Sequence, residues 1–365
     1  MMKRIVIKVG TAILSRPEGG LNLSRIKDLA RELSALAEKG YAPILVTSGA
    51  IGAGMDAFGW KERPTLLKDK QAAAAVGQVA LMEAYKGAFA PLGKTIAQVL
   101  LTRSDLDDRE RYLNIRNTLN ALLDRGVIPI INENDTVATQ EIKFGDNDTL
   151  SSLVAAKVDA THLFLLTDVD GLLTSTGEDG RLLPEVFQVT PDIEALVQAG
   201  TGSTKSVGGM ASKLTAARLA MASGVEVWIA SGRKPGIIKD ILDGKGIGTR
   251  FVPNAEALSA RKRWIAFGRK VQGAVHVDEG AVRALTENKR SLLPSGIRRV
   301  EGTFNAGDTI KVVTPENHEL ARGLTVFSSQ DLKKIQGRRS TEIESILTHP
   351  APAEVIHRNN LVLLP

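Results

Sequence analysis

Short apolar runs alternate with stretches of helical hydrophobic spacing over the first two thirds of the chain. The apolar runs predict strands at residues 5–9, 44–46, 96–101, 127–131, 162–166 and 225–229. The helical patterns between them predict helices at residues 22–39, 71–89, 109–123, 150–157, 210–222 and 237–242. Strands that alternate with helices in this way predict an α/β fold, with a parallel sheet covered by helices on both faces.

The pattern changes near residue 255, where the basic segment Arg261-Lys262-Arg263-Trp264 precedes short strands and turns. Glycines at positions 302, 307 and 323 punctuate this region. We therefore predict a first domain over residues 1–255, a linker over residues 256–274 and a small, mostly β domain over residues 275–365.

The composition excludes several kinds of chemistry. The chain has 365 residues and no cysteine, so it has no disulfide, no thiolate metal ligand and no cysteine nucleophile. No apolar run approaches the ~18 residues of a membrane-spanning helix. The opening residues, MMKRIVIKVG, have the pattern of a strand and lack the long apolar stretch of a signal peptide. We expect a cytoplasmic protein that has no membrane partner.

The positive charge is concentrated in the C-terminal third. The formal net charge of the chain is +6, and residues 256–365 hold 17 Lys and Arg against 12 Asp and Glu. A basic excess makes nucleic acid a candidate partner for that region. An ordinary solvated surface is equally compatible with an excess of this size.

Polar or small residues follow four of the predicted strands. The four segments are Lys8–Thr11, Thr47–Ala50, Asn132–Asp135 and Thr167–Asp168. In a parallel sheet the carboxyl ends of the strands lie along one edge, which is where ligands bind in open α/β folds. Glycines and polar residues also end many strands for backbone reasons alone, so the pattern by itself leaves both interpretations open.

The loop after the strand at residues 127–131 is acidic, and its last residues, GDND at 145–148, open the next helix. The acids of this region are Glu133, Asp135, Glu141, Asp146 and Asp148. Acidic loops are commonly just solvated. The functional alternative is recognition of a free ammonium group, a charge that an N-acylated amino acid lacks.

Two lysines are candidates for binding phosphate. The sequence contains neither a G-x-x-x-x-G-K-[ST] loop nor a G-x-G-x-x-G motif after a strand. However, Gly208-Gly209-Met210 opens a helix that carries Lys213 one turn later, and backbone N–H groups at a helix start attract anions. Lys8 interrupts an apolar strand, and a buried charge requires a partner or a cleft. The alternatives are a solvated lysine after a glycine turn and a surface lysine on an edge strand.

Six segments together resemble the amino-acid kinase family, and within it the branch that phosphorylates glutamate. They are KVGTAIL from Lys8, VTSGAIGAG from Val46, LLTRSDLDDRERYLN from Leu100, INENDTVATQEIKFGDNDTLS from Ile131, LLTDVDGL from Leu165 and GGMASKL from Gly208. The C-terminal part resembles a PUA domain, a small β fold found in RNA-modifying enzymes. The resemblance implies an αβα sandwich around a mainly parallel sheet. It also implies ATP-dependent phosphorylation of the side-chain carboxylate of L-glutamate to γ-glutamyl phosphate, the first step of proline biosynthesis.

The resemblance also implies roles for individual residues. Lys8 and Lys213 would stabilise the phosphoryl group in transfer, and Asp148 would orient them. The residues that would hold glutamate are Ser48, Asp135 and Asn147. The residues that would hold ATP are Lys8, Thr167, Asp168, Val207, Gly208, Gly209, Met210, Ala211, Ser212 and Lys213. Val207 stands where the family often has threonine, so a hydroxyl contact to ATP is in doubt at that position.

ATP and Mg²⁺ are the expected cofactors, with Mg²⁺ bridging the ATP phosphates. The protein ligands of the metal are left open, with Asp168 as one candidate. The expected partners, besides glutamate and ATP, are further copies of the chain in a homo-oligomer, a glutamyl phosphate reductase and RNA at the C-terminal domain. The alternative functions are a kinase of another small acid or of a nucleoside monophosphate, and an RNA-binding or RNA-modifying protein.

Overall fold

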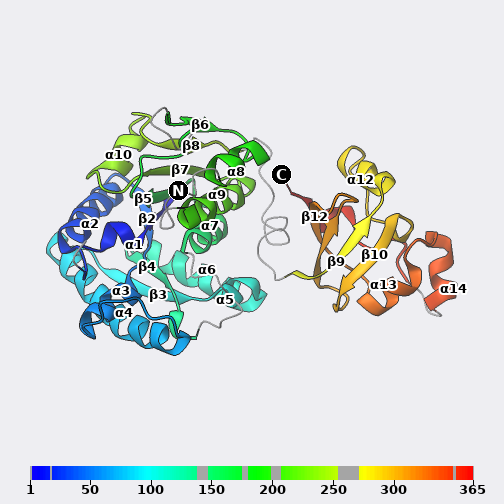
Figure 1. Cartoon of the computed structure of the whole chain (residues 1–365), viewed down its shortest axis with the longest axis horizontal. Helices are drawn as coiled ribbons and strands as arrows, with labels where there is room; N and C mark the ends of the chain where they lie inside the picture. The colour runs from blue at the N-terminus through cyan, green and yellow to red at the C-terminus, as the bar shows by residue number, and fades with distance from the viewer. Residues whose placement is uncertain are drawn as a thin grey trace. The chain divides into compact units, whose positions relative to one another are not determined.

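The computed structural model describes residues 2–16, 19–137, 147–174, 180–198, 207–253, 271–347 and 351–364. The chain divides into two compact units, Met1–Ala257 and Leu258–Pro365 (Figure 1). Each unit has a hydrophobic core of its own. Most of the predicted linker falls in residues 254–270, which lie outside the described part, so its bounds stay a prediction.

An eight-stranded sheet in the order β3-β4-β2-β1-β5-β7-β8-β6 forms the centre of the N-terminal unit. Its strands are β1 Lys3–Val9, β2 Tyr41–Val46, β3 Ile96–Leu101, β4 Ile128–Glu133, β5 His162–Thr167, β6 Glu185–Val186, β7 Glu226–Ser231 and β8 Thr249–Phe251. The pairings from β3 through β7 are parallel, as is that of β6 with β8. β8 runs antiparallel to β7. The prediction of a mainly parallel sheet is confirmed.

Helices cover both faces of this sheet (Figure 1). One layer contains α1 Thr11–Leu14, α2 Leu23–Glu38, α3 Ala50–Ala57, α4 Leu67–Phe89 with the short η1 Ala90–Leu92, and α10 Ile237–Leu242. The other layer contains α5 Arg103–Asp107, α6 Arg109–Leu123, α7 Asn147–Lys157, α8 Pro191–Gln198 and α9 Val207–Ala222. The unit is therefore an αβα sandwich, as the resemblance implies.

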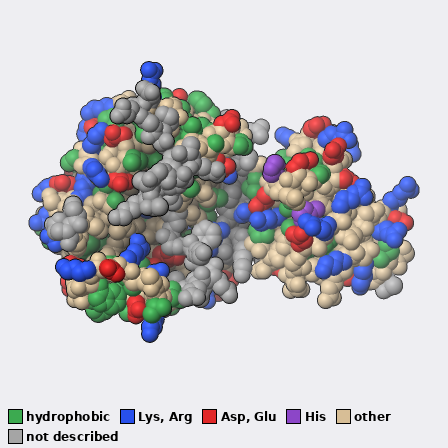
Figure 2. Space-filling view, in the orientation of Figure 1, with side chains coloured by type: hydrophobic (Ala, Val, Ile, Leu, Met, Phe, Trp, Pro, Cys, Tyr) green, Lys and Arg blue, Asp and Glu red, His purple; other side chains and the backbone are tan. Residues whose placement is uncertain are grey.

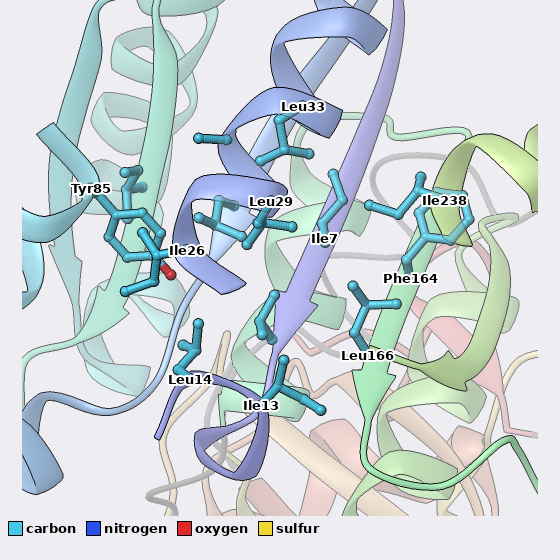
Figure 3. Close-up of a cluster of buried hydrophobic side chains, with 14 of the residues drawn as sticks. Ile7, Ile13, Leu14, Ile26, Leu29, Leu33, Tyr85, Phe164, Leu166 and Ile238 are labelled. Carbon is cyan, nitrogen blue, oxygen red and sulfur yellow. The ribbon is translucent and has the colours of Figure 1, made fainter. Parts of the chain in front are cut away.

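The central strand β1 sends alternate side chains to opposite layers. Ile5, Ile7 and Val9 join the core beneath α2, where Ile7 packs with Leu29 and Phe164 among others (Figure 3). Lys8 has the opposite parity, so it faces the layer that contains α7. The alternation thus explains how a lysine can lie in a buried strand without entering the apolar core.

Two glycines let α3 and α4 cross in close contact. A Cβ atom on Gly54 would lie 1.8 Å from the carbonyl oxygen of Ala73, and one on Gly77 would lie 1.8 Å from that of Ala50. The crossing holds α4 close to the strand ends. Tyr85 of α4 is fully buried, and its hydroxyl lies 2.7 Å from Oγ1 of Thr47, the residue that follows β2.

The C-terminal unit contains a five-stranded sheet in the order β10-β9-β11-β12-β13. Its strands are β9 Val271–Val277, β10 Ile297–Gly302, β11 Thr309–Val313, β12 Glu319–Leu324 and β13 Leu361–Leu363. Its helices are α12 Glu279–Thr286, α13 Ser329–Ile335 and α14 Ile343–Leu347, with short 3₁₀ turns η3 Pro294–Gly296, η4 Ser340–Glu342 and η5 Arg358–Asn360. Across the described residues of both units, no helix is long and apolar enough to cross a membrane.

Candidate active site

The four polar segments predicted from the sequence follow neighbouring parallel strands. β4, β2, β1 and β5 are adjacent in that order, so their carboxyl ends lie along one edge of the sheet. The residues after β1 also bond to β5, since the backbone N–H of Gly10 donates to the carbonyl oxygen of Leu166. The prediction that distant segments meet at one edge is confirmed.

Lys8, Asp148 and Lys213 form one buried cluster at this edge. Lys8 Nζ lies 2.6 Å from Asp148 Oδ1, and Lys213 Nζ lies 3.1 Å from Asp148 Oδ2. The three residues are only 5%, 1% and 6% exposed. They come from β1, from the first turn of α7 and from α9, so the tertiary structure brings together charges that are far apart in the sequence.

The carboxyl group of Asp148 is ionised in this cluster. Burial favours its neutral form, but Lys8, Lys213 and a hydrogen bond from Ser212 outweigh burial and hold the pKa of Asp148 below its ordinary value. Ser212 Oγ donates to Asp148 Oδ2 over 2.7 Å. Two ammonium groups on one carboxylate leave an excess positive charge, which suits an anionic ligand such as a phosphoryl group.

The first turns of α9 form the predicted phosphate-binding segment. The Lys213 ammonium donates to the carbonyl oxygen of Gly209 over 3.1 Å, and Ser212 Oγ, whose hydrogen is directed to Asp148, lies 3.0 Å from the same oxygen. Met210 is half-buried and Ala211 is exposed. The helix starts at Val207, whose side chain lies outside the described part, so the effect of Val207 on ATP binding stays a prediction.

A second group of polar residues meets beside the cluster. Asn147, the neighbour of Asp148, donates from Nδ2 to Ser48 Oγ and to Asn132 Oδ1, both over 3.2 Å. The predicted substrate residues Ser48 and Asn147 are thus in direct contact. The carbonyl oxygen Oδ1 of Asn147 is buried and has no hydrogen-bond partner among the described residues.

Asp135 belongs to the short 3₁₀ turn η2, Asp135–Val137, which packs against α4. Burial raises the pKa of Asp135, whereas the positive charge of Arg63 acts in the opposite direction. A partly buried carboxylate of this kind would gain from a cationic ligand. The predicted acids Glu141 and Asp146 lie outside the described residues.

Thr167 is the last residue of β5, and Asp168 follows it at the same edge. The Thr167 hydroxyl donates to Asp168 Oδ1 over 3.1 Å, and the exposed Asp168 carboxylate faces solvent. The described residues contain no group of three or more His, Asp or Glu side chains that could hold a metal ion.

Two residues of the site are absent from the predicted set. The sequence pattern indicates Asn132 only as part of the polar segment at the end of a strand, and it does not indicate Gln78. Gln78 accepts a hydrogen bond from Asn132 Nδ2 over 2.9 Å. The sequence feature that could have identified Gln78 is its spacing on α4. It recurs at helical intervals with Ala74, Leu81 and Tyr85, which are all buried. A polar residue on such a face requires a partner.

Comparisons with known proteins agree with this architecture. Residues 3–231 match the model of the amino acid kinase family, and residues 273–347 match that of the PUA domain. Carbamate kinase from Giardia lamblia bound to AMP-PNP aligns with a TM-score of 0.51, at 21% identity, over 69% of this chain and 99% of that chain. At this identity the similarity shows a shared fold.

Curated relatives align over the full length of the chain. Glutamate 5-kinase of Moorella thermoacetica is 52% identical over 365 residues, which are 99% of this chain and 96% of the relative. Glutamate 5-kinase of Trichormus variabilis is 50% identical over 368 residues and covers both chains completely. The chain therefore belongs to the amino acid kinase family and, within it, to the glutamate 5-kinases.

Proposed function

We propose that the N-terminal unit transfers the γ-phosphoryl group of ATP to the side-chain carboxylate of L-glutamate. A carboxylate oxygen attacks the γ-phosphorus, the bond to the β–γ bridging oxygen breaks, and γ-glutamyl phosphate and ADP are the products. The observation that carries the proposal is the buried Lys8–Asp148–Lys213 cluster, which lies beside the buried oxygen Oδ1 of Asn147, an acceptor with no partner among the described residues. The names of the full-length relatives support the choice of glutamate.

The chemistry requires positioning and charge more than proton transfer. A glutamate side chain, with an ordinary pKa of about 4.3, is already ionised at neutral pH, so the nucleophile requires no general base. Asp148 is held ionised between two lysines, which fits an orienting role. Lys8 and Lys213 would meet the negative charge on the transferring group without reorganisation. The same ammonium groups reduce the repulsion between the carboxylate and the phosphates.

The amino end of the substrate would lie near Asn147 and Asp135. Asn147 offers a buried oxygen that no described residue bonds to, and Asp135 offers a carboxylate whose ionisation is opposed by burial. An ammonium group would satisfy both, since it donates hydrogen bonds and carries positive charge. Ser48, whose oxygen accepts from Asn147, keeps its hydroxyl hydrogen for a substrate oxygen.

ATP would bind along the segment from Gly209 to Lys213 and at Thr167 and Asp168. Mg²⁺ commonly takes one or two carboxylates plus phosphate oxygens and waters, which fits an edge where Asp168 is the exposed carboxylate. When bound, the metal would neutralise phosphate charge. The carboxylate of Asp168 would then be a protein ligand of Mg²⁺, while Lys8 and Lys213 would act on the γ-phosphoryl oxygens.

The test is trapping of the acyl phosphate by hydroxylamine, with L-glutamate, L-aspartate, N-acetyl-L-glutamate and UMP offered in parallel with Mg²⁺ and ATP. The expected result is a hydroxamate with glutamate and little with the others. Faster turnover of N-acetylglutamate or aspartate, or phosphorylation of UMP alone, would overturn the assignment. ADP formation in each reaction separates transfer from simple ATP hydrolysis.

We propose RNA binding as a second activity, carried by the C-terminal unit. It contains a cavity of about 640 Å³, whose lining includes Arg290, Arg358 and His357 together with the carboxylates of Asp278 and Glu354. Figure 2 shows Lys and Arg side chains of this unit interspersed with Asp and Glu. Filter binding of tRNA across a salt series tests the proposal, because phosphate contacts make the affinity fall steeply with salt. Affinity that is absent at low salt would exclude it.

Two further partners belong to the same proposal. Large exposed apolar side chains on α4 and in the segment that joins α3 to α4, among them Phe58, Leu66 and Val79, support a homo-oligomer, which light scattering would test. An acyl phosphate is unstable in water, so a glutamyl phosphate reductase would be the natural consumer in proline biosynthesis. A coupled assay with and without that enzyme would show whether the intermediate reaches solvent.

A further inference from the structure

A chain of side-chain amides runs from the substrate edge into helix α4. Asn147 Nδ2 donates to Asn132 Oδ1 over 3.2 Å, and Asn132 Nδ2 donates to Gln78 Oε1 over 2.9 Å. The three amides come from α7, from the end of β4 and from α4, and Asn132 is only 2% exposed. We call Gln78, Asn132 and Asn147 the amide relay.

A backbone group determines the direction of the relay. The N–H of Glu133 donates to Asn132 Oδ1 over 3.0 Å, and a backbone N–H can only donate. Asn132 Oδ1 is therefore the acceptor end, and its Nδ2 must face Gln78. As a consequence Asn147 must present Nδ2 to Asn132, and Gln78 must present Oε1. The orientation of all three amides follows from one backbone contact.

This direction leaves a different free group at each end. Asn147 keeps an acceptor, Oδ1, and Gln78 keeps a donor, Nε2. Both atoms are buried, and neither has a hydrogen-bond partner in the described part of the chain. Leaving such groups unsatisfied is costly, so the free ends of this one hydrogen-bonded chain favour a ligand that supplies the missing partners. An α-amino acid carries the matching pair, an ammonium donor and a carboxylate acceptor on one carbon atom.

We propose that Gln78 determines specificity for the α-carboxylate of the amino-acid substrate, which accepts a hydrogen bond from Gln78 Nε2 while the relay presents Asn147 Oδ1 to the ammonium group. The inference rests on the proposed function and extends it to the end of the substrate that does not react. Gln78 lies at the far end of the relay from Asn147, whose neighbour Asp148 holds the two lysines. The α-carboxylate and the reacting side chain are thereby assigned to different ends of the site.

Two variants of Gln78 separate its donor from its acceptor. Gln78→Glu keeps an oxygen for Asn132 Nδ2 but replaces the free donor with a charged acceptor. Gln78→Met keeps the length of the side chain and removes both functions. Glu83→Met, at an exposed position of the same helix, is the matched control. Circular dichroism and melting temperature establish which variants are folded, and Gln78→Glu serves alone if Gln78→Met does not fold.

The substrates are L-glutamate and its α-carboxamide, L-isoglutamine, which retains the ammonium group and the side-chain carboxylate. We expect the KM for glutamate to rise on the order of 10- to 100-fold in both variants, the scale of one charge-assisted hydrogen bond, with the KM for ATP within about twofold of the parent. The parent's preference for glutamate over isoglutamine should fall by on the order of tenfold or more in Gln78→Glu. The reason is that the introduced side-chain carboxylate can accept a hydrogen bond from the α-carboxamide of isoglutamine. Calorimetric titration of glutamate without ATP should show the same loss of affinity.

The outcomes are distinguishable. If the parent phosphorylates glutamate and the folded variants retain its KM and its preference, Gln78 has no part in recognition and this inference fails alone. If the KM values for glutamate and ATP rise equally, Gln78 supports the fold and the inference fails as well. If the parent neither binds nor phosphorylates glutamate, the proposed function fails, and this inference fails with it.

Discussion

Lys8 and Asp148 form an ion pair of 2.6 Å between residues 140 positions apart in the sequence. Lys213 binds the other oxygen of the same carboxylate. The pair places an ammonium group from the central strand at the start of α7, beside the amide of Asn147. One carboxylate therefore connects the side of the site that would meet phosphate with the side that would meet the amino acid.

The first prediction concerns this cluster. Lys8→Met and Lys213→Met should each lower kcat by on the order of 10²–10³, because each removes one donor to the transition state. The KM values should change less, since the lost contact strengthens mainly in the transition state. Steady-state kinetics of the folded variants measure both.

Asp148→Asn provides the control for cooperation in the cluster. If the residues act as a unit, Lys8→Met combined with Asp148→Asn should lose less activity than the product of the two single losses. Near-normal kcat in Lys8→Met would contradict the catalytic role of Lys8.

The second prediction concerns Asp135 and pH. Asp135→Ala should raise the KM for glutamate far more than that for ATP, at a cost of roughly 1.5–3 kcal/mol for a hydrogen bond to a charged group. Burial raises the pKa of Asp135 above its ordinary value of 3.8, so its neutral form accumulates at a higher pH than in an exposed aspartate. The neutral form cannot pair with an ammonium group, so the KM for glutamate should rise as the pH falls towards this raised pKa.

Asp135→Asn is the matched control for the pH profile. The substrate carboxylates titrate in a nearby range in both proteins, so only the difference between the two profiles reports Asp135. Identical profiles for the parent and Asp135→Asn would argue against the ammonium contact.

The third prediction concerns the C-terminal unit. The proposed catalytic residues all lie within the unit Met1–Ala257, which has its own core. A chain that ends between Ala257 and β9 should fold and phosphorylate glutamate with a kcat within about tenfold of the parent, a shift of at most roughly 1.4 kcal/mol in the barrier. Hydroxamate trapping and circular dichroism check this. A folded truncation that is inactive at every glutamate concentration would place the C-terminal unit in the active site.

The fourth prediction concerns the glycines of α4. Gly77→Ala should lower the free energy of unfolding by about 3 kcal/mol or more, since its Cβ would lie 1.8 Å from a backbone carbonyl oxygen and would force α3 and α4 apart. Gly87→Ala, on the same helix with open space around it, should instead raise the stability by about 0.5–1 kcal/mol. Urea unfolding of the two variants measures the contrast, and equal effects would contradict the close crossing.

The layers of the N-terminal unit and much of the site follow from the pattern of residues along the chain. Strands of buried, nearly continuous apolar residues require cover on both faces, and this requirement is readable from the order of the patterns. A parallel sheet then aligns the carboxyl ends of its strands. The order of the strands therefore suffices to predict that Lys8, Ser48, Asn132 and Thr167 lie at one edge. Lys8 was identifiable because a charge in an apolar strand requires a partner.

Which side chains are in contact, in contrast, depends on how the helices and strands pack in three dimensions. Contact between Asp148 and Lys213 depends on how α7 and α9 pack on the sheet, and long-range packing leaves no periodic signal in the sequence. The same holds for Gln78, which lies in an alanine-rich helix and acquires its role only because Gly54 and Gly77 let α4 lie close to the end of β4. The direction of the amide relay depends on a single backbone N–H of Glu133. Hydrogen-bond polarity at this level is a property of three-dimensional contacts, and no pattern of residue types encodes it.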